Sequence, residues 1–300
     1  MEAQLTALRP ELVGFAYRMI GSPFEAEDAA QETLLRAWKH LGDYDAARGS
    51  LRTWVYRIAT NVCLDMLRSA QRRARSTDFA PSGDLGEPMP ASAWVWPLPG
   101  DPAAVAESRD GIRLAFVAAL QHLPPRQRAV LILRDVLCWP AADVAGLLDT
   151  TVPSVTSALQ RARAALRAAG PGEPGRLTDA AKLSLVERYA DAFHREDIAG
   201  LVALLQEDVV NSMPPFAWWI RGRDTVATVM AASDACHGAR LVPAWANGTY
   251  ALWQERPTGP GGAFEPFALL VFDFGDELIS EVTTFLGFRL SSSTGDIRPG

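Results

Sequence analysis

Apolar residues recur at helical spacing through the first 75 residues of the chain. The pattern predicts three helices: the first ends at Gly21, the second runs from about Glu25 to Leu41, and the third begins after Ser50. Acidic residues fill the first turn of the second helix, and the Ser50 hydroxyl can accept hydrogen bonds from the free amides of the third. We therefore expect an all-helical domain over residues 1–75.

The helical pattern stops at Ser76. Residues 76–108 are rich in Pro, Gly and Asp and contain no Lys or Arg. A segment of this composition without helical periodicity is typical of a linker, and we interpret it as one.

Helical periodicity returns over residues 109–170. It is interrupted at Leu123-Pro124-Pro125, at Trp139-Pro140 and at Asp149-Thr150-Thr151. The last two breaks enclose a short helix, and a three-residue turn then leads into a longer helix over 152–167. These are the proportions of a helix-turn-helix, with Thr151 in position to cap the longer helix.

Beyond a second linker at residues 171–177, one or two helices (about 180–205) precede short alternating strands with Gly and Pro turns. We expect an α+β domain over residues 178–290 and a flexible tail at 291–300. The predicted fold class is therefore multidomain: two all-α domains, the second with a helix-turn-helix, and a C-terminal α+β domain.

The net charge of −6 is unevenly distributed along the chain. Residues 1–75 carry +2 and residues 109–170 carry +4, whereas 76–108 carry −5 and 171–300 carry −7. Two basic modules suited to nucleic acid thus alternate with acidic stretches. Because there is no secretory signal, no membrane-length apolar run and no close cysteine pair, we expect a cytoplasmic protein without metal or cofactor.

The longer helix of the helix-turn-helix has an apolar face for packing and an opposite face that is short and polar. Gln and Arg can make paired hydrogen bonds to base edges in the major groove, and further arginines can contact phosphates. A solvated helix face that never touches DNA is the alternative. The candidate readers are Ser154, Ser157, Gln160, Arg161 and Arg163.

Two features of the first domain carry further chemistry. The third helix interleaves aromatic residues with arginines, a pattern suited to single-stranded nucleic acid, although Trp54 is better explained as a core residue. The second helix has a charged edge, which could equally be a solvated face with ion pairs along the helix. That edge consists of Asp28, Gln31, Glu32 and Arg36.

Three motifs in a fixed order resemble the sigma-70 family of RNA polymerase initiation factors, of the extracytoplasmic-function type. They are AEDAAQETLLRAW (26–38), SLRTWVYRIATNVCLDMLR (50–68) and LPPRQRAVLILRDVLCWPAADVAGLLDTTVPSVTSALQRARAALR (123–167). The resemblance implies two helical domains, region two and region four, joined by a flexible linker.

The resemblance also implies partners and roles. The Asp28 to Arg36 edge matches the family surface that binds the polymerase β′ clamp helices, so core RNA polymerase, with its β′ and β subunits, and promoter DNA are the expected partners. Asn61 matches a position near the pocket for a flipped base of the −10 element, with Arg57 and Arg68 as phosphate contacts. The face from Ser154 to Arg163 matches the reader of the −35 element. No residue implies catalysis.

The last 130 residues resemble the SnoaL-like superfamily, an α+β fold around an apolar pocket. Tyr189, Met213, Trp218 and Trp219 are candidate pocket residues, with Trp245 as a further aromatic. The scattered acids and histidines are Asp191, His194, His237 and Asp273. Regulation of the helical part, by intramolecular contact or a small molecule, is expected. A one-component DNA-binding regulator and a fused cyclase or isomerase remain the alternatives.

Overall fold

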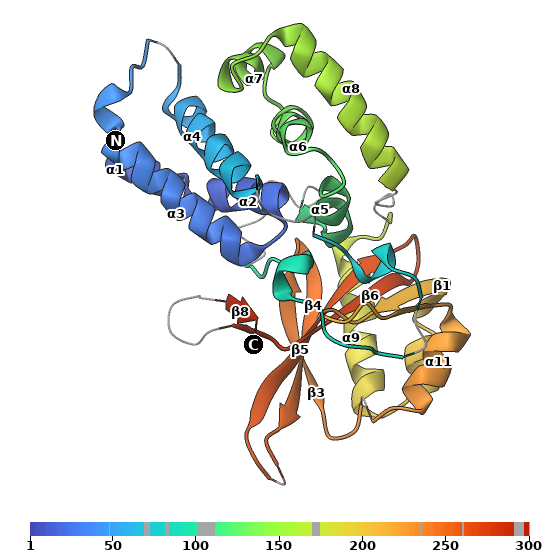
Figure 1. Ribbon diagram of the computed structural model, residues 1–300. Helices are drawn as coiled ribbons and strands as arrows, with labels where there is room; N and C mark the ends of the chain where they lie inside the picture. Colours follow the sequence, from blue (N-terminus) through green and yellow to red (C-terminus); the bar gives the residue numbers. More distant parts are fainter. Residues whose placement is uncertain are drawn as a thin grey trace. The chain divides into compact units, whose positions relative to one another are not determined.

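A computed structural model describes residues 1–47, 49–68, 73–81, 84–100, 112–169, 175–234, 236–259, 261–290 and 297–299. The chain forms two compact units (Figure 1). The helical unit comprises Met1–Arg73 and Asp110–Gly172, and the sheet unit comprises Ala74–Arg109 and Glu173–Gly300. The segment predicted as the first linker therefore groups with the C-terminal domain.

The first part of the helical unit consists of α1 (Glu2–Ala7), α2 (Arg9–Ile20), α3 (Pro23–Lys39) and α4 (Leu51–Met66), with the short η1 (Leu41–Asp43) after α3. The first predicted helix is two helices, because Pro10 lacks an amide proton and its ring clashes with the preceding turn. Gly21 ends α2 in the left-handed region at φ 79°. The Ser50 cap is confirmed: its hydroxyl accepts from the Thr53 amide at 3.1 Å.

The second part of the helical unit begins with α5 (Leu114–Leu120) and α6 (Pro125–Leu131). A π-helical turn, η6 (Ile132–Val136), extends α6 and leads to α7 (Ala141–Leu147) and α8 (Val152–Ala169). Thr151 caps α8 as predicted, accepting from the Ser154 amide at 3.3 Å. Helices α7 and α8 pack together as the expected helix-turn-helix.

The sheet unit contains α9 (Asp179–His194), α10 (Ile198–Val202) and α11 (Arg223–Ala231), of which the sequence pattern did not reveal α11. Its strands form a six-stranded sheet in the order β2-β1-β6-β5-β4-β3. Their bounds are β1 (Leu205–Ser212), β2 (Trp219–Arg221), β3 (Arg240–Ala246), β4 (Thr249–Pro257), β5 (Phe264–Phe274) and β6 (Ile279–Leu286). A hairpin of β7 (Phe288–Leu290) and β8 (Ile297–Pro299) follows, so part of the predicted tail pairs with β7, whereas 291–296 lie outside the described residues.

One face of the sheet packs against the helices. Alternate strand residues such as Leu270, Phe272 and Val282 point to this side, where they meet Tyr189 and Phe193 of α9. Because side chains alternate across a strand, the neighbours Leu269, Val271 and Phe285 occupy the opposite face. These three residues are also buried, so the second face needs a cover of its own.

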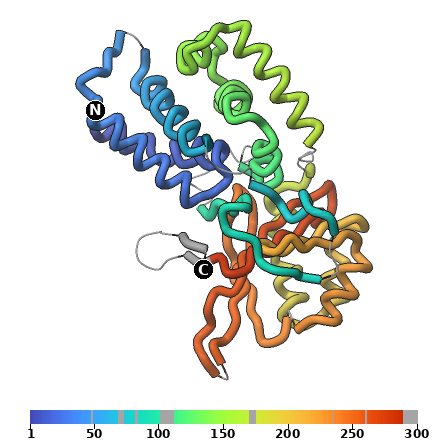
Figure 2. Tube along the Cα trace, in the orientation of Figure 1, coloured from blue at the N-terminus to red at the C-terminus, as the bar shows by residue number. Residues whose placement is uncertain are grey.

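The first linker provides that cover. Figure 2 traces its blue-green tube across the sheet of this unit. Trp96 stacks on Phe288 and also contacts Phe285, with ring centroids 5.8 Å apart in both pairs. Trp94 and Val95 are buried as well. The expected flexible linker is thus, over its described residues, an ordered layer, because its few large apolar side chains outweigh its Pro- and Gly-rich composition.

Hydrogen bonds hold the described part of the linker, which includes the short helical turns η2 (Ser76–Asp78) and η3 (Ala91–Ala93). Met89 donates to the Pro215 carbonyl at 2.8 Å, and Leu98 exchanges two hydrogen bonds with Asn247 at 2.8 and 3.0 Å. At the start of the segment Arg75 pairs with Glu281 on β6. Although burial alone would lower the pKa of Arg75, the carboxylates of Glu281 and Asp273 hold it above its ordinary value.

Removing one linker side chain tests this packing. We expect Trp96→Ala to destabilise the sheet unit by about 3 to 5 kcal/mol, the usual cost of deleting a buried aromatic ring. Urea unfolding of the full chain, followed by tryptophan fluorescence and circular dichroism, measures the change. Leu85→Ala is the matched control, because Leu85 lies in the same segment but is 42% exposed. Equal stability of both variants would contradict the packing.

Candidate nucleic-acid and polymerase surfaces

The charged edge predicted on the second helix lies on α3, and its residues share one side of the helix. Asp28, Gln31 and Arg36 are exposed, and Glu32 is half-buried. Arg36 donates to the Glu32 carboxylate at 2.7 Å. The two residues are four apart in sequence, about one helical turn. The edge therefore presents charge to solvent, with one internal ion pair that contributes little to stability.

The same side of α3 carries exposed apolar residues that the charge pattern did not reveal. Leu35 is 46% exposed and Trp38 is 59% exposed. With Leu5 and Arg9 from α1 and α2 they line a groove of about 520 Å³. The Trp38 indole donates to Glu2 of α1 at 3.2 Å. The sequence did indicate that Leu35 and Trp38 lie on this side of the helix, since both continue the spacing of three and four residues from Asp28. Large apolar residues on a helix usually belong to the core, however, so their exposure was not predicted.

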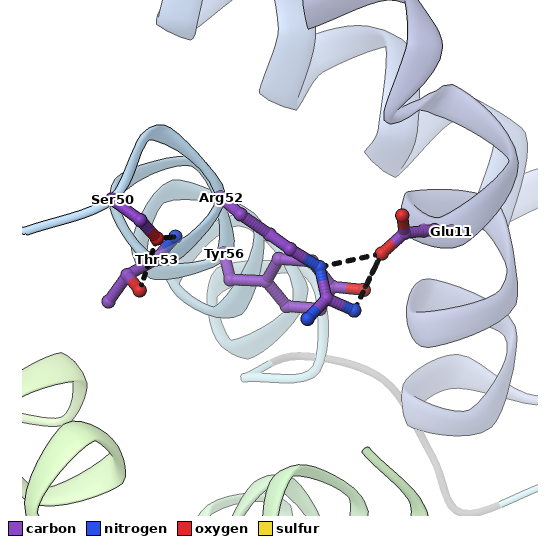
Figure 3. A network of polar contacts seen from close by, with 5 residues as sticks. All are labelled: Glu11, Ser50, Arg52, Thr53 and Tyr56. Atoms are coloured by element: carbon purple, nitrogen blue, oxygen red, sulfur yellow. Dashed lines mark hydrogen bonds and ion pairs between the residues drawn. The ribbon is translucent and has the colours of Figure 1, made fainter. Parts of the chain in front are cut away.

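Helix α4 is anchored to α2 by a polar network. The Arg52 guanidinium and the Tyr56 hydroxyl both donate to Glu11, at 2.8 and 3.3 Å (Figure 3). The Tyr56 ring meets Phe15 edge to face at 5.3 Å. Burial, reinforced by the Glu11 carboxylate, raises the pKa of Tyr56 above its ordinary value. The hydroxyl therefore remains a proton donor, and the exposed side of α4 is held in a fixed orientation.

Two of the predicted −10 residues, Arg57 and Asn61, lie on the exposed side of α4, and Arg68 follows its C-terminal end. Asn61 is exposed, one helical turn from Arg57. Arg57 makes two hydrogen bonds to the Asp149 carboxylate, at 2.6 and 2.7 Å. Arg68 lies 3.3 Å from Asp65. Trp54, expected in the core, is only half-buried, with its ring 5.6 Å from that of Tyr44.

The predicted reading face of α8 is exposed over its whole length. Ser154, Ser157, Gln160 and Arg161 all face solvent. The opposite face packs inward through Val155, Leu159 and Ala162. Arg163 is exposed but is held by two hydrogen bonds to Asp135 of η6, at 2.8 and 2.7 Å. On the exposed face, Ser154 and Ser157 are small and Gln160 is uncharged, which suits a close approach to base edges.

The two parts of the helical unit meet at a buried arginine that sequence reasoning missed. Arg128 of α6 donates to the Met19 carbonyl at the end of α2, to the Gln121 side chain at 2.6 Å and to the Leu123 carbonyl at 3.1 Å. Burial lowers the pKa of Arg128 to about 10. The group remains a cation at neutral pH, and carbonyl oxygens solvate it in place of water.

The predicted pocket residues of the sheet unit lie in different surroundings. Tyr189 is in the helix-facing core, 5.2 Å edge to face from Phe272, and burial raises its pKa. Trp218 is buried near the turn that contains Met213. Trp219 donates from its indole to the Phe79 carbonyl of the linker at 2.9 Å. Trp245 contacts Tyr250 edge to face at 4.8 Å. Tyr189 and Trp245 thus make ring contacts within the sheet unit, and Trp219 holds the linker by a hydrogen bond.

The four scattered acids and histidines do not converge. Asp191 and His194 are exposed on α9, where the His194 Nε2 accepts from the Leu241 amide at 2.8 Å. His237 is exposed and lies 3.3 Å from Glu196. Asp273 is on the linker-covered face, opposite Glu281 in the strand register. No acid and base among them face a common space in which a substrate could react.

Two further findings concern the described residues alone. Within them, no three His, Cys, Asp or Glu side chains are grouped so that they could hold a metal ion. Nor does any helix in the described part of the chain have the length and apolar character needed to cross a bilayer.

Comparison with known proteins gives consistent matches. The family model of sigma-70 region 2 matches residues 5–73, and that of sigma-70 region 4 matches residues 113–166. The chain is 41% identical to the ECF RNA polymerase sigma factor SigG of Mycobacterium tuberculosis, over 96% of this chain and 81% of SigG. It is 29% identical to SigJ of the same species, over 75% of this chain and 70% of SigJ.

A solved structure extends the likeness to the whole fold. The crystal structure of M. tuberculosis SigJ, titled an extracytoplasmic function sigma factor, superposes with a TM-score of 0.66 at 22% identity. The match covers 95% of this chain and 96% of SigJ. Two helical parts followed by a mixed α and β domain are therefore a shared architecture, as the sequence predicted.

Proposed function

Since the chain belongs to the extracytoplasmic-function (ECF) RNA polymerase sigma factors, we propose that it binds core RNA polymerase and directs initiation at specific promoters. The observation that carries this function is the set of exposed surfaces on α3, α4 and α8, each matching one family motif. The protein acts by binding, and the polymerase performs the chemistry. Its place of action is then the cytoplasm, where it meets polymerase and chromosome.

The polymerase contact is assigned to α3. Asp28, Gln31, Glu32 and Arg36 form its charged edge, and Leu35 with Trp38 supplies an apolar centre. Interfaces draw most of their affinity from a few large side chains surrounded by polar contacts. The groove beside Trp38 gives the β′ clamp helices a surface with both properties.

Promoter reading is assigned to α4 and α8. On α4, Asn61 can hydrogen-bond to an unpaired base of the −10 element, while Arg57 and Arg68 neutralise phosphates. On α8, Ser154, Ser157, Gln160 and Arg161 read the −35 element in the major groove, and Arg163 contacts the backbone. Both readers must bind one promoter at the same time.

The sheet unit is proposed to regulate that spacing through the linker. The two elements lie about 25 base pairs apart, roughly 85 Å along B-form DNA. With the linker docked through Gly100, only the chain from Gly100 to Ile112 is free, and it adds at most about 40 Å to the fixed span of the docked segment. With the linker released, the chain from Arg73 to Ile112 can extend to roughly 130 Å. Linker docking therefore limits how far the two DNA-binding domains can separate.

An enzymatic role for the sheet unit has less support, because its acids and histidines are scattered over different faces. A one-component regulator would have no use for the α3 edge. Intramolecular regulation needs only the contacts already described between the linker and the sheet. A small molecule that changed those contacts would regulate the protein in the same way, by changing linker docking.

The α3 surface can be tested by charge reversal. We expect the double variant Asp28→Arg/Glu32→Arg to lose core polymerase in a pull-down, because two attractive or hydrogen-bonding groups become repulsive. Glu187→Arg/Asp191→Arg is the matched control, with the same charge change at the same helical spacing on exposed α9. Circular dichroism checks that both variants fold. Unchanged polymerase binding by the α3 variant would remove this surface from the interface.

The α8 surface can be tested on the holoenzyme at fixed salt. We expect Arg161→Ala to weaken promoter binding by about 1 to 3 kcal/mol and to relax base preference within the −35 element. Arg167→Ala is the comparison: Arg167 is exposed on α8 outside the assigned readers, and an arginine that contacts only phosphate weakens binding to all sequences alike. Footprinting against a panel of single-base promoter variants distinguishes loss of a base contact from loss of a phosphate contact. An unchanged base preference after Arg161→Ala would exclude it as a reader.

Truncation tests the regulatory role. A chain ending at Ala169 lacks the sheet on which the linker docks, so we expect increased transcription from the cognate promoter by core polymerase. Trp96→Ala in the full chain weakens docking without deleting the domain and should change transcription in the same direction. Equal transcription by the full and truncated chains would contradict regulation by the sheet unit. Turnover of a small molecule by the sheet unit would favour the enzymatic alternative.

A further inference from the structure

The turn that joins β3 to β4 consists of Asn247 and Gly248. Both residues have a positive φ, 52° for Asn247 and 71° for Gly248, as a two-residue hairpin turn of type I′ requires. Hairpin turns usually lie in solvent, yet Asn247 is 1% exposed. A neighbouring segment must therefore cover this turn.

The linker lies against the turn and contributes to this cover. The Asn247 backbone amide donates to the Leu98 carbonyl at 2.8 Å, and the Leu98 amide donates to the Asn247 side-chain oxygen at 3.0 Å. Two positions further along, the Gly100 amide donates to the Trp245 carbonyl of β3 at 3.3 Å. We call the pair of hydrogen bonds between Asn247 and Leu98 the Asn247 clasp. The clasp holds the Asn247 side chain in one orientation.

An asparagine that precedes a glycine is chemically unstable in water, because glycine has no Cβ to hinder attack on the asparagine side chain. The backbone nitrogen of Gly248, once it has lost its proton to hydroxide, attacks Cγ of Asn247 and forms a cyclic imide. The side-chain nitrogen takes up a proton and leaves as ammonia. Water then adds to one of the two ring carbonyls and opens the ring, which gives either aspartate or isoaspartate.

Docking of the linker opposes this reaction at two stages. The clasp holds the carboxamide oxygen of Asn247 on the Leu98 amide, so the side chain must leave the linker before Cγ can turn toward the Gly248 nitrogen. Burial of Asn247 also keeps out the water and hydroxide that the reaction requires. Release of the linker removes both restraints.

The two products affect the clasp differently. Aspartate keeps a side-chain oxygen for the Leu98 amide, and the charge on this acceptor strengthens the hydrogen bond. Isoaspartate carries the chain through its side-chain carbon, so the two-residue turn becomes longer and no longer fits the pairing of β3 with β4. Its free carboxylate is attached directly to Cα, one carbon short of the position from which Asn247 reaches Leu98. Isoaspartate therefore removes the clasp.

We propose that Asn247-Gly248 is a deamidation site that linker docking protects, and that isoaspartate formed after release prevents the linker from docking again. The inference rests on the proposed regulation by linker docking, and it adds a chemical modification that makes release permanent. Protein that stays docked keeps Asn247, whereas protein that stays undocked is converted at the rate of deamidation.

A pair of substitutions at Leu98 tests the protection. Leu98→Pro removes the amide that holds the Asn247 side chain, while the backbone is already restricted to extended conformations because Pro99 follows. Leu98→Ala is the matched control, since it shortens the same side chain but keeps the amide. Both variants are used as full-length proteins, and circular dichroism checks that they fold.

The proteins are incubated at mildly alkaline pH, and peptide mapping by mass spectrometry follows deamidation in the tryptic peptide from Leu241 to Arg256. We expect Leu98→Pro to deamidate at Asn247 about two- to tenfold faster than Leu98→Ala, the range set by the loss of one intramolecular hydrogen bond.

Trp96→Ala weakens docking as a whole and should raise the rate at Asn247 by about tenfold or more, where each tenfold corresponds to about 1.4 kcal/mol of docking free energy. Because this variant also destabilises the sheet unit, Asn211 of β1 is the internal reference, and it is followed by Ser212. General unfolding accelerates deamidation at both asparagines, whereas linker release accelerates it at Asn247. Equal rates in the two Leu98 variants, with a proportional rise at Asn211 and Asn247 in Trp96→Ala, would overturn the protection.

Hydrogen exchange tests whether isoaspartate keeps the linker undocked. In the docked state the Met89 amide donates to the Pro215 carbonyl at 2.8 Å, so the linker amides should exchange slowly. Wild-type protein aged in mild urea and returned to buffer should lose this protection in its isoaspartate fraction. Asn247→Asp, which has no amide to lose and keeps the acceptor, should retain it. An isoaspartate-specific methyltransferase, which returns isoaspartate to aspartate, should restore protection. Full protection in the isoaspartate fraction would overturn the second part of the proposal.

Transcription distinguishes failure of this inference from failure of the proposed function. If truncation after Ala169 increases transcription but deamidation at Asn247 does not respond to the linker variants, the inference is wrong and regulation by the sheet unit stands. If Leu98→Pro accelerates deamidation while truncation leaves transcription unchanged, the modification site stands and the regulatory role is wrong. If fresh wild-type protein does not support initiation with core polymerase, the sigma function itself is wrong.

Discussion

A β-sheet with two apolar faces must be covered on both sides, and this constraint organises the sheet unit. The helices cover one face through Tyr189, Phe193 and their neighbours. The other face carries the buried residues Leu269, Val271 and Phe285, and Trp96 of the linker packs on Phe285 there. Burying an aromatic ring of this size outweighs the entropy of fixing a short Pro-rich segment, whose backbone is already restricted. The linker is therefore held by hydrophobic packing, and the Arg75–Glu281 pair selects its position.

The two parts of the helical unit are joined by contacts of a different kind. They meet through hydrogen bonds of Arg128 and Gln121 to the end of α2 and through the ring contact of Trp139 with Tyr56. Arg128 inserts a cation beneath the end of α2, where the helix leaves carbonyls without internal partners.

The helices and the fold class could be predicted because local signals agreed with one another. Ser50 and Thr151 were recognisable caps, and Pro124 and Pro140 marked breaks that the structure keeps. The exposed faces of α3 and α8 followed from periodicity, although resemblance was needed to assign their partners. Pro10 also carried a readable signal, but the apolar spacing on either side of it favoured one continuous helix.

The remaining features depend on contacts between residues far apart in sequence. Trp96 meets Phe285 across a chain separation that no local pattern encodes, so Pro and Gly content correctly indicated an irregular segment but not a buried one. Arg57 and Asp149 each suited a local role, one as a phosphate contact and one as a turn residue. Only the fold brings them together. Leu35 and Trp38 were obscured because an exposed tryptophan is uncommon unless a partner covers it.

The sheet unit is discontinuous in sequence, since Asp110–Gly172 is inserted between its linker and the rest of its chain. This has a consequence for synthesis on the ribosome. Strand β6 emerges well over a hundred residues after Trp96. At bacterial elongation rates of about 5 to 20 residues per second, the linker waits for roughly 10 to 40 s before its sheet exists. During that interval the nascent chain presents Trp94, Val95 and Trp96 without cover, next to a finished first helical module. Until β5 and β6 are made, these apolar side chains are therefore open to non-native contacts.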